Sequence, residues 1–84
     1  MVTHLLAVPV SHRDIIDRGE GSTAVARKIS EIEEANGRQP VDPNTAKAWK
    51  RTDSIPGIYW QAFVDAGLAT LEELAAAAAA KRAA

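Results

Sequence analysis

The sequence predicts an all-α fold, a compact bundle of about five helices around one core. Apolar residues recur at three- and four-residue spacing, as at Val25, Ala26, Ile29 and Ile32, which is the period of one helix face. Capping residues precede the helical stretches, and glycines follow most of them. A chain of 84 residues suits one small domain better than two subdomains.

Two helices are predicted in the first half of the chain. Ser11 begins the first helix, with Asp14 three residues later as its capping partner, and Gly19 ends it. The second helix begins at Ser22 and continues until the Asn-Gly pair at 36–37.

The third helix is predicted after a loop at 37–41, which contains Gly and Pro and shows no periodicity. Asp42 is a good N-cap, and Pro43 suits the first turn, where its missing N–H has no intrahelical partner. Ser54 and Pro56 end this helix.

Two further helices are predicted in the second half. The fourth covers 56–67, with a core stripe made by Trp60, Phe63 and Val64. Thr70 and Glu73 form a capping box for the fifth helix, over 71–84. Two leucines of this helix, Leu71 and Leu74, are expected to dock onto the core.

Composition excludes several classes of protein. Ten Lys and Arg against eleven Asp and Glu give a net charge of −1, so the chain does not coat nucleic acid or membrane indiscriminately. Without cysteine it has no disulfide, thiolate nucleophile or sulfur-bound zinc. No apolar run approaches the ~20 residues that span a bilayer, and no signal peptide is recognised at the start. We expect a cytoplasmic, nucleoid-associated protein.

Catalytic and metal sites are not predicted, and neither is a cofactor. His4 and His12 stand eight residues apart without a matching constellation, so both are expected to be ordinary surface or cap residues. Two acidic pairs are interpreted as solvated charges on exposed helices: Asp14 with Asp17, and Glu33 with Glu34.

The third helix, residues 43–52, has two different faces. At 100° per residue, Ala46 and Trp49 point to one side, which we assign to the core. The other side carries Asn44, Lys47, Ala48 and Arg51, with Lys50 at its border. Such a face suits DNA, because the major groove admits one helix, Arg and Lys match guanine acceptors, and Asn pairs with adenine. By itself it is weak evidence, since any solvated amphipathic helix exposes Lys and Arg.

The order of the elements adds weight, because two successive helices of this kind form a helix-turn-helix. GSTAVARKI, NTAKAWKRTDSIP and YWQAFVDAGL together resemble small Cro- and repressor-like regulators of phages and mobile elements, especially carph-isopro domains. The resemblance covers roughly residues 11–75. Its most specific element is WKRTDSIP followed by Trp60.

The resemblance implies a sequence-specific, repressor-like regulator that inserts residues 43–52 into the major groove of double-stranded DNA. It implies base-edge contacts for Asn44, Thr45, Lys47 and Arg51, and phosphate contacts for Ser22, Thr23 and Lys50. No cofactor is implied.

The chain departs from the family in the connection between the two helices. SEIEEANGRQPV follows Ile29, about ten residues more than the usual turn. We expect extra turns of the second helix and a longer loop, which leaves the angle between the helices open. Arg38 and Gln39 are predicted to touch backbone phosphates, while Glu31, Glu33 and Glu34 should point away from them.

The predicted organisation is an apolar segment at 1–10, the DNA-binding domain at 11–75 and an alanine-rich helix end at 76–84. The first segment is either a short strand or an extended cover over the core. The alanine-rich end is either a solvated overhang or a contact with a second copy, in a homodimer on an inverted-repeat site. A helical protein-interaction module, such as an antitoxin-like or polymerase-associated adaptor, is the alternative function.

Overall fold

Residues 10–83, which a computed structural model describes, form five α-helices and one short 3₁₀-helix, with no strand among them. The elements are α1 His12–Arg18, α2 Ser22–Ala35, α3 Pro43–Thr52, η2 Gly57–Tyr59, α4 Trp60–Asp65 and α5 Leu71–Ala83. The prediction of an all-α fold is therefore confirmed for this part of the chain. The strand or cover predicted for 1–10 lies, apart from Val10, outside the described residues.

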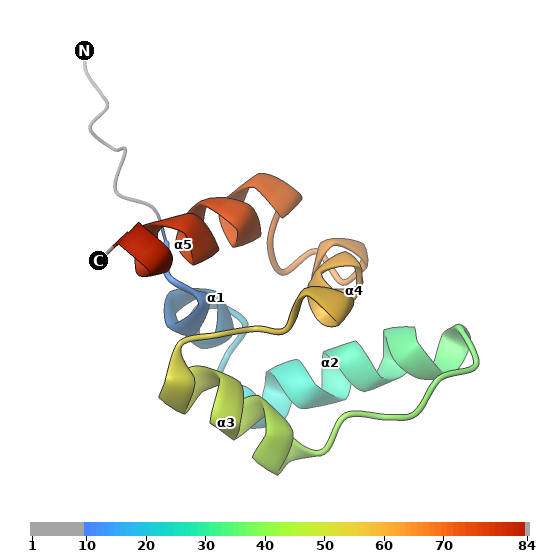
Figure 1. The fold of residues 1–84 in the computed structure, drawn as a ribbon. Helices are drawn as coiled ribbons and strands as arrows, with labels where there is room; N and C mark the ends of the chain where they lie inside the picture. The colour runs from blue at the N-terminus through green and yellow to red at the C-terminus, as the bar shows by residue number, and fades with distance from the viewer. Residues whose placement is uncertain (1–9, 84) are drawn as a thin grey trace.

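The helices are arranged around a core to which α1 to α5 all contribute. In Figure 1, α2 and α3 lie together on one side of the molecule and α5 on the other, with α1 and α4 between them. α1 contacts α3 as well as α5, and α4 contacts α2 as well as α5. The largest fully buried side chains come from four helices: Ile15, Ile16, Val25, Ile29, Phe63 and Leu74. Ala46 and Trp49 add the contribution of α3.

Local capping signals account for several helix boundaries. Ser11 and Asp14 form the predicted capping box of α1. Asp42 accepts a hydrogen bond from the Asn44 amide at 2.7 Å, as an N-cap should. Glu73 accepts from the amide of Thr70 at 3.0 Å and donates its own amide to the Thr70 hydroxyl at 3.1 Å. These three caps were predicted and are confirmed.

Two predictions in the second half of the chain need correction. The predicted fourth helix is divided, because the 3₁₀-turn η2 comes first and α4 begins only at Trp60. Leu71 is 51% exposed, so the prediction that it docks onto the core is wrong. Leu74 and Ala77 of α5 are buried, whereas Leu71, the first residue of the helix, is not covered.

His12 is buried, so the prediction that it is a surface or cap residue is wrong. Its Nδ1 accepts a hydrogen bond from the Ile55 amide at 2.8 Å, and the ring proton therefore sits on Nε2, which donates to the Leu74 carbonyl at 2.9 Å. The imidazole thus joins α1 to the segment after α3 and to α5. Its partners are backbone groups 43 and 62 residues away, which no local sequence pattern reveals.

A second connection between α1 and α5 is the ion pair of Arg18 with Glu73. The guanidinium donates to both carboxylate oxygens, at 3.0 and 2.9 Å, and also to the Leu68 carbonyl at 2.7 Å. The Arg18 hydrogen bonds, helped by the Thr70 amide, lower the pKa of Glu73 to about 2. This pair therefore stays ionised in the folded protein well into the acid range.

Replacing His12 by Ala should lower the free energy of unfolding by about 2–4 kcal/mol, because two buried backbone groups lose their partners at about 1–3 kcal/mol each. Urea denaturation followed by circular dichroism measures this change. Ser54→Ala is the matched control, since Ser54 lies beside His12 but is exposed. The control should stay within about 0.5 kcal/mol of wild type, and equal losses in both variants would contradict the role of His12.

Acid should weaken the fold through Glu73. The folded carboxylate has a pKa of about 2 and the unfolded one is near its ordinary value of 4.5, so its contribution is complete above pH 4.5 and is lost as pH falls toward 2. We expect Glu73→Gln to be less stable than wild type at pH 6, with the difference shrinking by pH 2.5. Solvent screening at this half-exposed pair keeps the difference small. A constant difference across the series would show that the ion pair contributes nothing.

Candidate nucleic-acid interface

The two faces of α3 separate as the sequence predicts. Ala46 and Trp49 are buried, and the Trp49 indole packs against the rings of Tyr59 and Phe63 at centroid distances of 4.9 and 5.9 Å. On the opposite side Asn44, Lys47 and Arg51 are exposed as predicted, whereas Ala48 between them is half-buried. With Thr45, which is also exposed, these three polar or charged residues form the set we call the α3 face: Asn44, Thr45, Lys47 and Arg51. A large aromatic anchor on one side therefore fixes which side chains of this helix meet solvent.

The beginning of α3 is tied to α2. The Ser30 hydroxyl donates to the Val41 carbonyl at 3.1 Å and accepts from the Val41 amide at 2.8 Å. The Val41 side chain is also buried. Hydrogen bonds and burial therefore both fix the residue that precedes the Asp42 cap. The connection between α2 and α3 comprises residues 36–42, and α2 continues beyond Ile29 to Ala35. The expected extra turns and longer loop are both present.

The end of α3 is secured by side chains from α1 and α5. The last carbonyls of a helix have no intrahelical partner. Arg13 donates from Nε to the Lys50 carbonyl at 3.1 Å and reaches the Arg51 carbonyl at 3.5 Å. Lys81 of α5 donates to the Thr52 carbonyl and, at 3.3 Å, to that of Asp53. The carbonyls from Lys50 to Asp53 thus all receive hydrogen bonds from outside the helix.

Asp53 has a double role at this junction. Its backbone is left-handed, with φ of 54°, and its amide donates back to the Lys50 carbonyl, which closes α3. Its carboxylate accepts from the Arg13 amide at 2.8 Å, in the first turn of α1, where the helix dipole favours an anion. α1 and α3 therefore cap each other, which fixes the orientation of α3 relative to the core.

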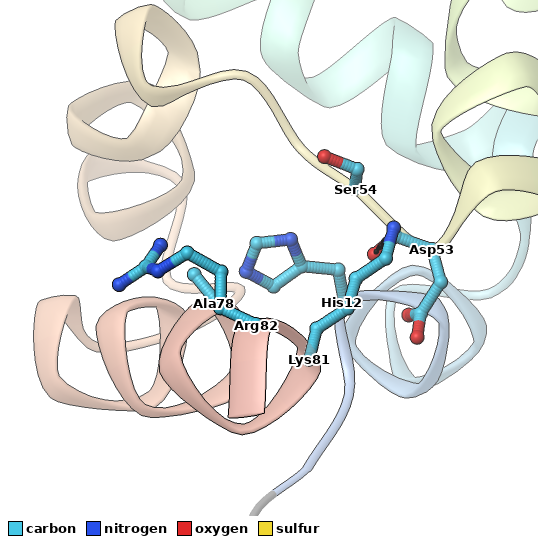
Figure 2. A pocket seen from close by; sticks show the side chains of 6 residues that line it. All are labelled: His12, Asp53, Ser54, Ala78, Lys81 and Arg82. Carbon is cyan, nitrogen blue, oxygen red and sulfur yellow. Dashed lines mark hydrogen bonds between the residues drawn. The ribbon is translucent and has the colours of Figure 1, made fainter. Parts of the chain in front are cut away.

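A groove of about 340 Å³ lies where α5 meets this junction, lined by His12, Asp53, Ser54, Ala78, Lys81 and Arg82 (Figure 2). The Lys81 side chain extends from α5 toward the segment at Asp53 and Ser54. None of the residues of the α3 face lines this groove. The α3 face therefore remains uncovered by α5.

Lys50, expected to hold a phosphate, already has an acidic partner. Its Nζ lies 2.7 Å from a carboxylate oxygen of Asp17 in α1, and both side chains are about half exposed, at 43% and 50%. Asp17, interpreted from the sequence as a solvated charge, is therefore paired with a cation. Lys50 can therefore contact a phosphate only if the phosphate replaces the Asp17 carboxylate.

Arg38 is also engaged. Its guanidinium donates to both carboxylate oxygens of Glu33, the shortest distance being 2.7 Å. Glu33 is only 4% exposed, so the interpretation of Glu33 as a solvated charge is wrong. A buried carboxylate is costly without a partner, so Arg38 stabilises Glu33. Gln39, next in the loop, is exposed.

The side of α2 that faces α3 extends this surface. Ser30 bonds to the chain directly before α3, and Thr23 and Arg27 lie seven and three residues earlier, on the same side by helical spacing. Thr23 and Arg27 are exposed, whereas Ser22, the first residue of α2, is half-buried. Sequence reasoning missed Arg27, although its spacing of four from Thr23 was a usable signal. Glu34, one turn beyond Ser30, makes the far end acidic.

Comparisons with protein-family models, curated proteins and solved structures found no match to this chain. Within residues 10–83, no helix is long and apolar enough to cross a membrane. The same part of the chain holds no group of three potential metal ligands.

Trp49→Ala should cost about 3–5 kcal/mol of stability, because it leaves a large void under α3. The double variant Lys47→Ala, Arg51→Ala should stay within about 1 kcal/mol of wild type, since both side chains are exposed. Urea denaturation of the three proteins measures the difference. Similar losses in the two variants would show that the assignment of the faces is wrong.

Proposed function

We propose that this chain is a sequence-specific double-stranded DNA-binding regulator of the repressor-like helix-turn-helix type. The observation that carries the proposal is the α3 face, four exposed polar or charged side chains on a helix whose opposite side is buried and whose ends are hydrogen-bonded to α1 and α5 and tied to α2. In the proposed complex α3 enters the major groove. The resemblance to small Cro- and repressor-like regulators supplies the repressor-like role.

The chemistry of the α3 face fits base edges. Lys47 and Arg51 are four residues apart, so their donors lie along one line of the helix and can meet the O6 and N7 acceptors of guanine. Asn44 can pair with adenine through its amide, and the Thr45 hydroxyl can bond to any base edge. Each well-formed bidentate pair discriminates by about 1–3 kcal/mol, which suffices for sequence preference.

Phosphate contacts are proposed for residues flanking this face. Ser22 and Thr23 stand at the N-terminal end of α2, where amides and the helix dipole favour an anion. Arg27 adds a cation to the same side of α2, and Lys50 adds one from α3. Gln39 is assigned to the DNA backbone beside the start of α3, and so is Arg38 through its Nη1, because its Nε and Nη2 donate to Glu33. A chain with a net charge of −1 can then bind DNA locally without binding it everywhere.

The rigid attachment of α3 favours recognition of bases, as opposed to a loose electrostatic contact with the DNA. Recognition requires side chains held within about 0.5 Å of the productive geometry. The bonds of Arg13 and Lys81 to the end of α3, together with Trp49 beneath it, supply that support. A homodimer would place two such helices on half-sites about one DNA turn apart, and we include this arrangement in the proposal for inverted-repeat sites.

A protein-interaction module is the second candidate, and one observation favours it. Ile58 in η2 is 80% exposed, which is high for a large apolar side chain. Scattered exposed apolar residues are ordinary on soluble proteins, and only contiguous patches mark an interface. DNA is therefore the partner to test first.

The test is selection of bound sequences from a random duplex pool, followed by fluorescence anisotropy of the selected duplex from 50 to 200 mM salt. We expect log affinity to fall with log salt by about 0.9 per phosphate contacted. Lys47→Ala with Arg51→Ala should weaken binding roughly 30-fold or more, from two contacts of at least about 1 kcal/mol each.

The matched control removes two cations elsewhere, Lys28→Ala with Arg82→Ala, which lie outside the α3 face. The affinity of this control for the duplex should fall only a few-fold, because it has the same change in net charge but keeps the α3 face. Equal losses in the two double variants would mean that the charge of the chain, and not the α3 face, binds the duplex. No selectable sequence and no salt-dependent binding would overturn the proposal.

A further inference from the structure

Asp17 holds the one border cation of α3 in the free protein. Its carboxylate oxygen lies 2.7 Å from the Lys50 ammonium, in direct ion-pair contact. Asp17 belongs to α1, 33 positions earlier in the chain, so only the packing of α1 on α3 brings the two charges together. The residue is absent from every base or phosphate contact proposed above.

The position of the ion pair is set by contacts that hold α1 against α3. Arg13 lies one helical turn before Asp17, and so on the same side of α1. Its amide bonds to the Asp53 carboxylate and its guanidinium to the Lys50 carbonyl, at 2.8 and 3.1 Å. These contacts set the position of α1 against the last turn of α3. Because the Asp17 side chain is short, this position of α1 places its carboxylate next to Lys50. The ion pair therefore does not depend on two long side chains meeting by chance.

We infer that Asp17 competes with DNA phosphate for Lys50 and thereby restrains the sequence-independent part of binding. This inference rests on the proposed function. Carboxylate and phosphate oxygens are the same kind of partner for an ammonium group. On binding, a phosphate replaces the carboxylate at Lys50, and the released Asp17 charge remains beside the DNA backbone, where it repels phosphates. Both steps subtract from phosphate affinity and leave the contacts of the α3 face unchanged.

The size of the effect follows from exposure. Exposed ion pairs change an equilibrium by up to about five-fold. Asp17→Asn removes the competitor and its repulsion, so affinity for a duplex should rise about three- to ten-fold at low salt. Lys50 contacts a phosphate in both complexes, so the slope of log affinity against log salt should change by less than the value of about 0.9 that a whole phosphate contact gives. Asp17 lies in the last turn of α1, where an anion opposes the helix dipole, so its replacement should not unfold the chain.

The experiment measures binding of a 20-base-pair duplex of random sequence and of the selected duplex by fluorescence anisotropy over the same salt series. Four variants are compared with wild type: Asp17→Asn, Lys50→Gln, the double variant of both, and Asp65→Asn. Asp65 is the matched control, because it is exposed on α4, accepts a bond from Gln61 that Asn can also accept, and carries the same charge. Thermal melts verify that each variant is folded.

Support would be a three- to ten-fold gain in affinity in Asp17→Asn, a gain below two-fold in Asp65→Asn, and a smaller gain when Asp17→Asn is introduced into Lys50→Gln. No gain in Asp17→Asn, or an equal gain in Asp65→Asn, would overturn the inference while wild-type binding through Lys47 and Arg51 stands. If no protein in the series binds either duplex, the proposed function fails and the inference fails with it.

Discussion

Burial of Trp49 is the constraint on which the rest of the molecule depends. Its indole lies between α3 and the rings of Tyr59 and Phe63, and Ala46, one turn earlier, lets another helix approach closely. A helix can rotate about its axis only if its buried side chains leave the core, and exposing a tryptophan has a large free-energy cost. The orientation of every polar residue on α3 follows from this one anchor.

The ends of α3 are held as firmly as its inner side, and the two kinds of restraint are complementary. Trp49 fixes rotation, whereas the hydrogen bonds of Arg13 and Lys81 to the last carbonyls fix tilt and position. These bonds come from α1 and α5, which His12 and the Arg18–Glu73 pair connect to each other and to the segment after α3. The polar groups that satisfy the helix end also join the three helices into one rigid support.

Internal contacts also decide which cations are available. Five basic residues bond to carboxylates or carbonyls of the chain itself: Arg13, Arg18, Arg38, Lys50 and Lys81. Lys47 and Arg51 have no such partner among residues 10–83 and lie on one exposed side of α3. A nearly neutral chain can thus present a local basic surface, because the carboxylates that form ion pairs contact other cations and not Lys47 or Arg51.

The sequence by itself determined the helices, apart from the division of the fourth, and the buried side of α3, because caps, glycines and three- to four-residue spacing are local and a helix has a fixed period. It predicted the longer α2 and loop for the same reason. It failed at His12, Glu33 and Leu71, whose burial or exposure depends on how segments distant along the chain pack together. Only the tertiary structure decided that Asp17 meets Lys50, since ion pairs between helices arise from packing, which residue spacing does not encode.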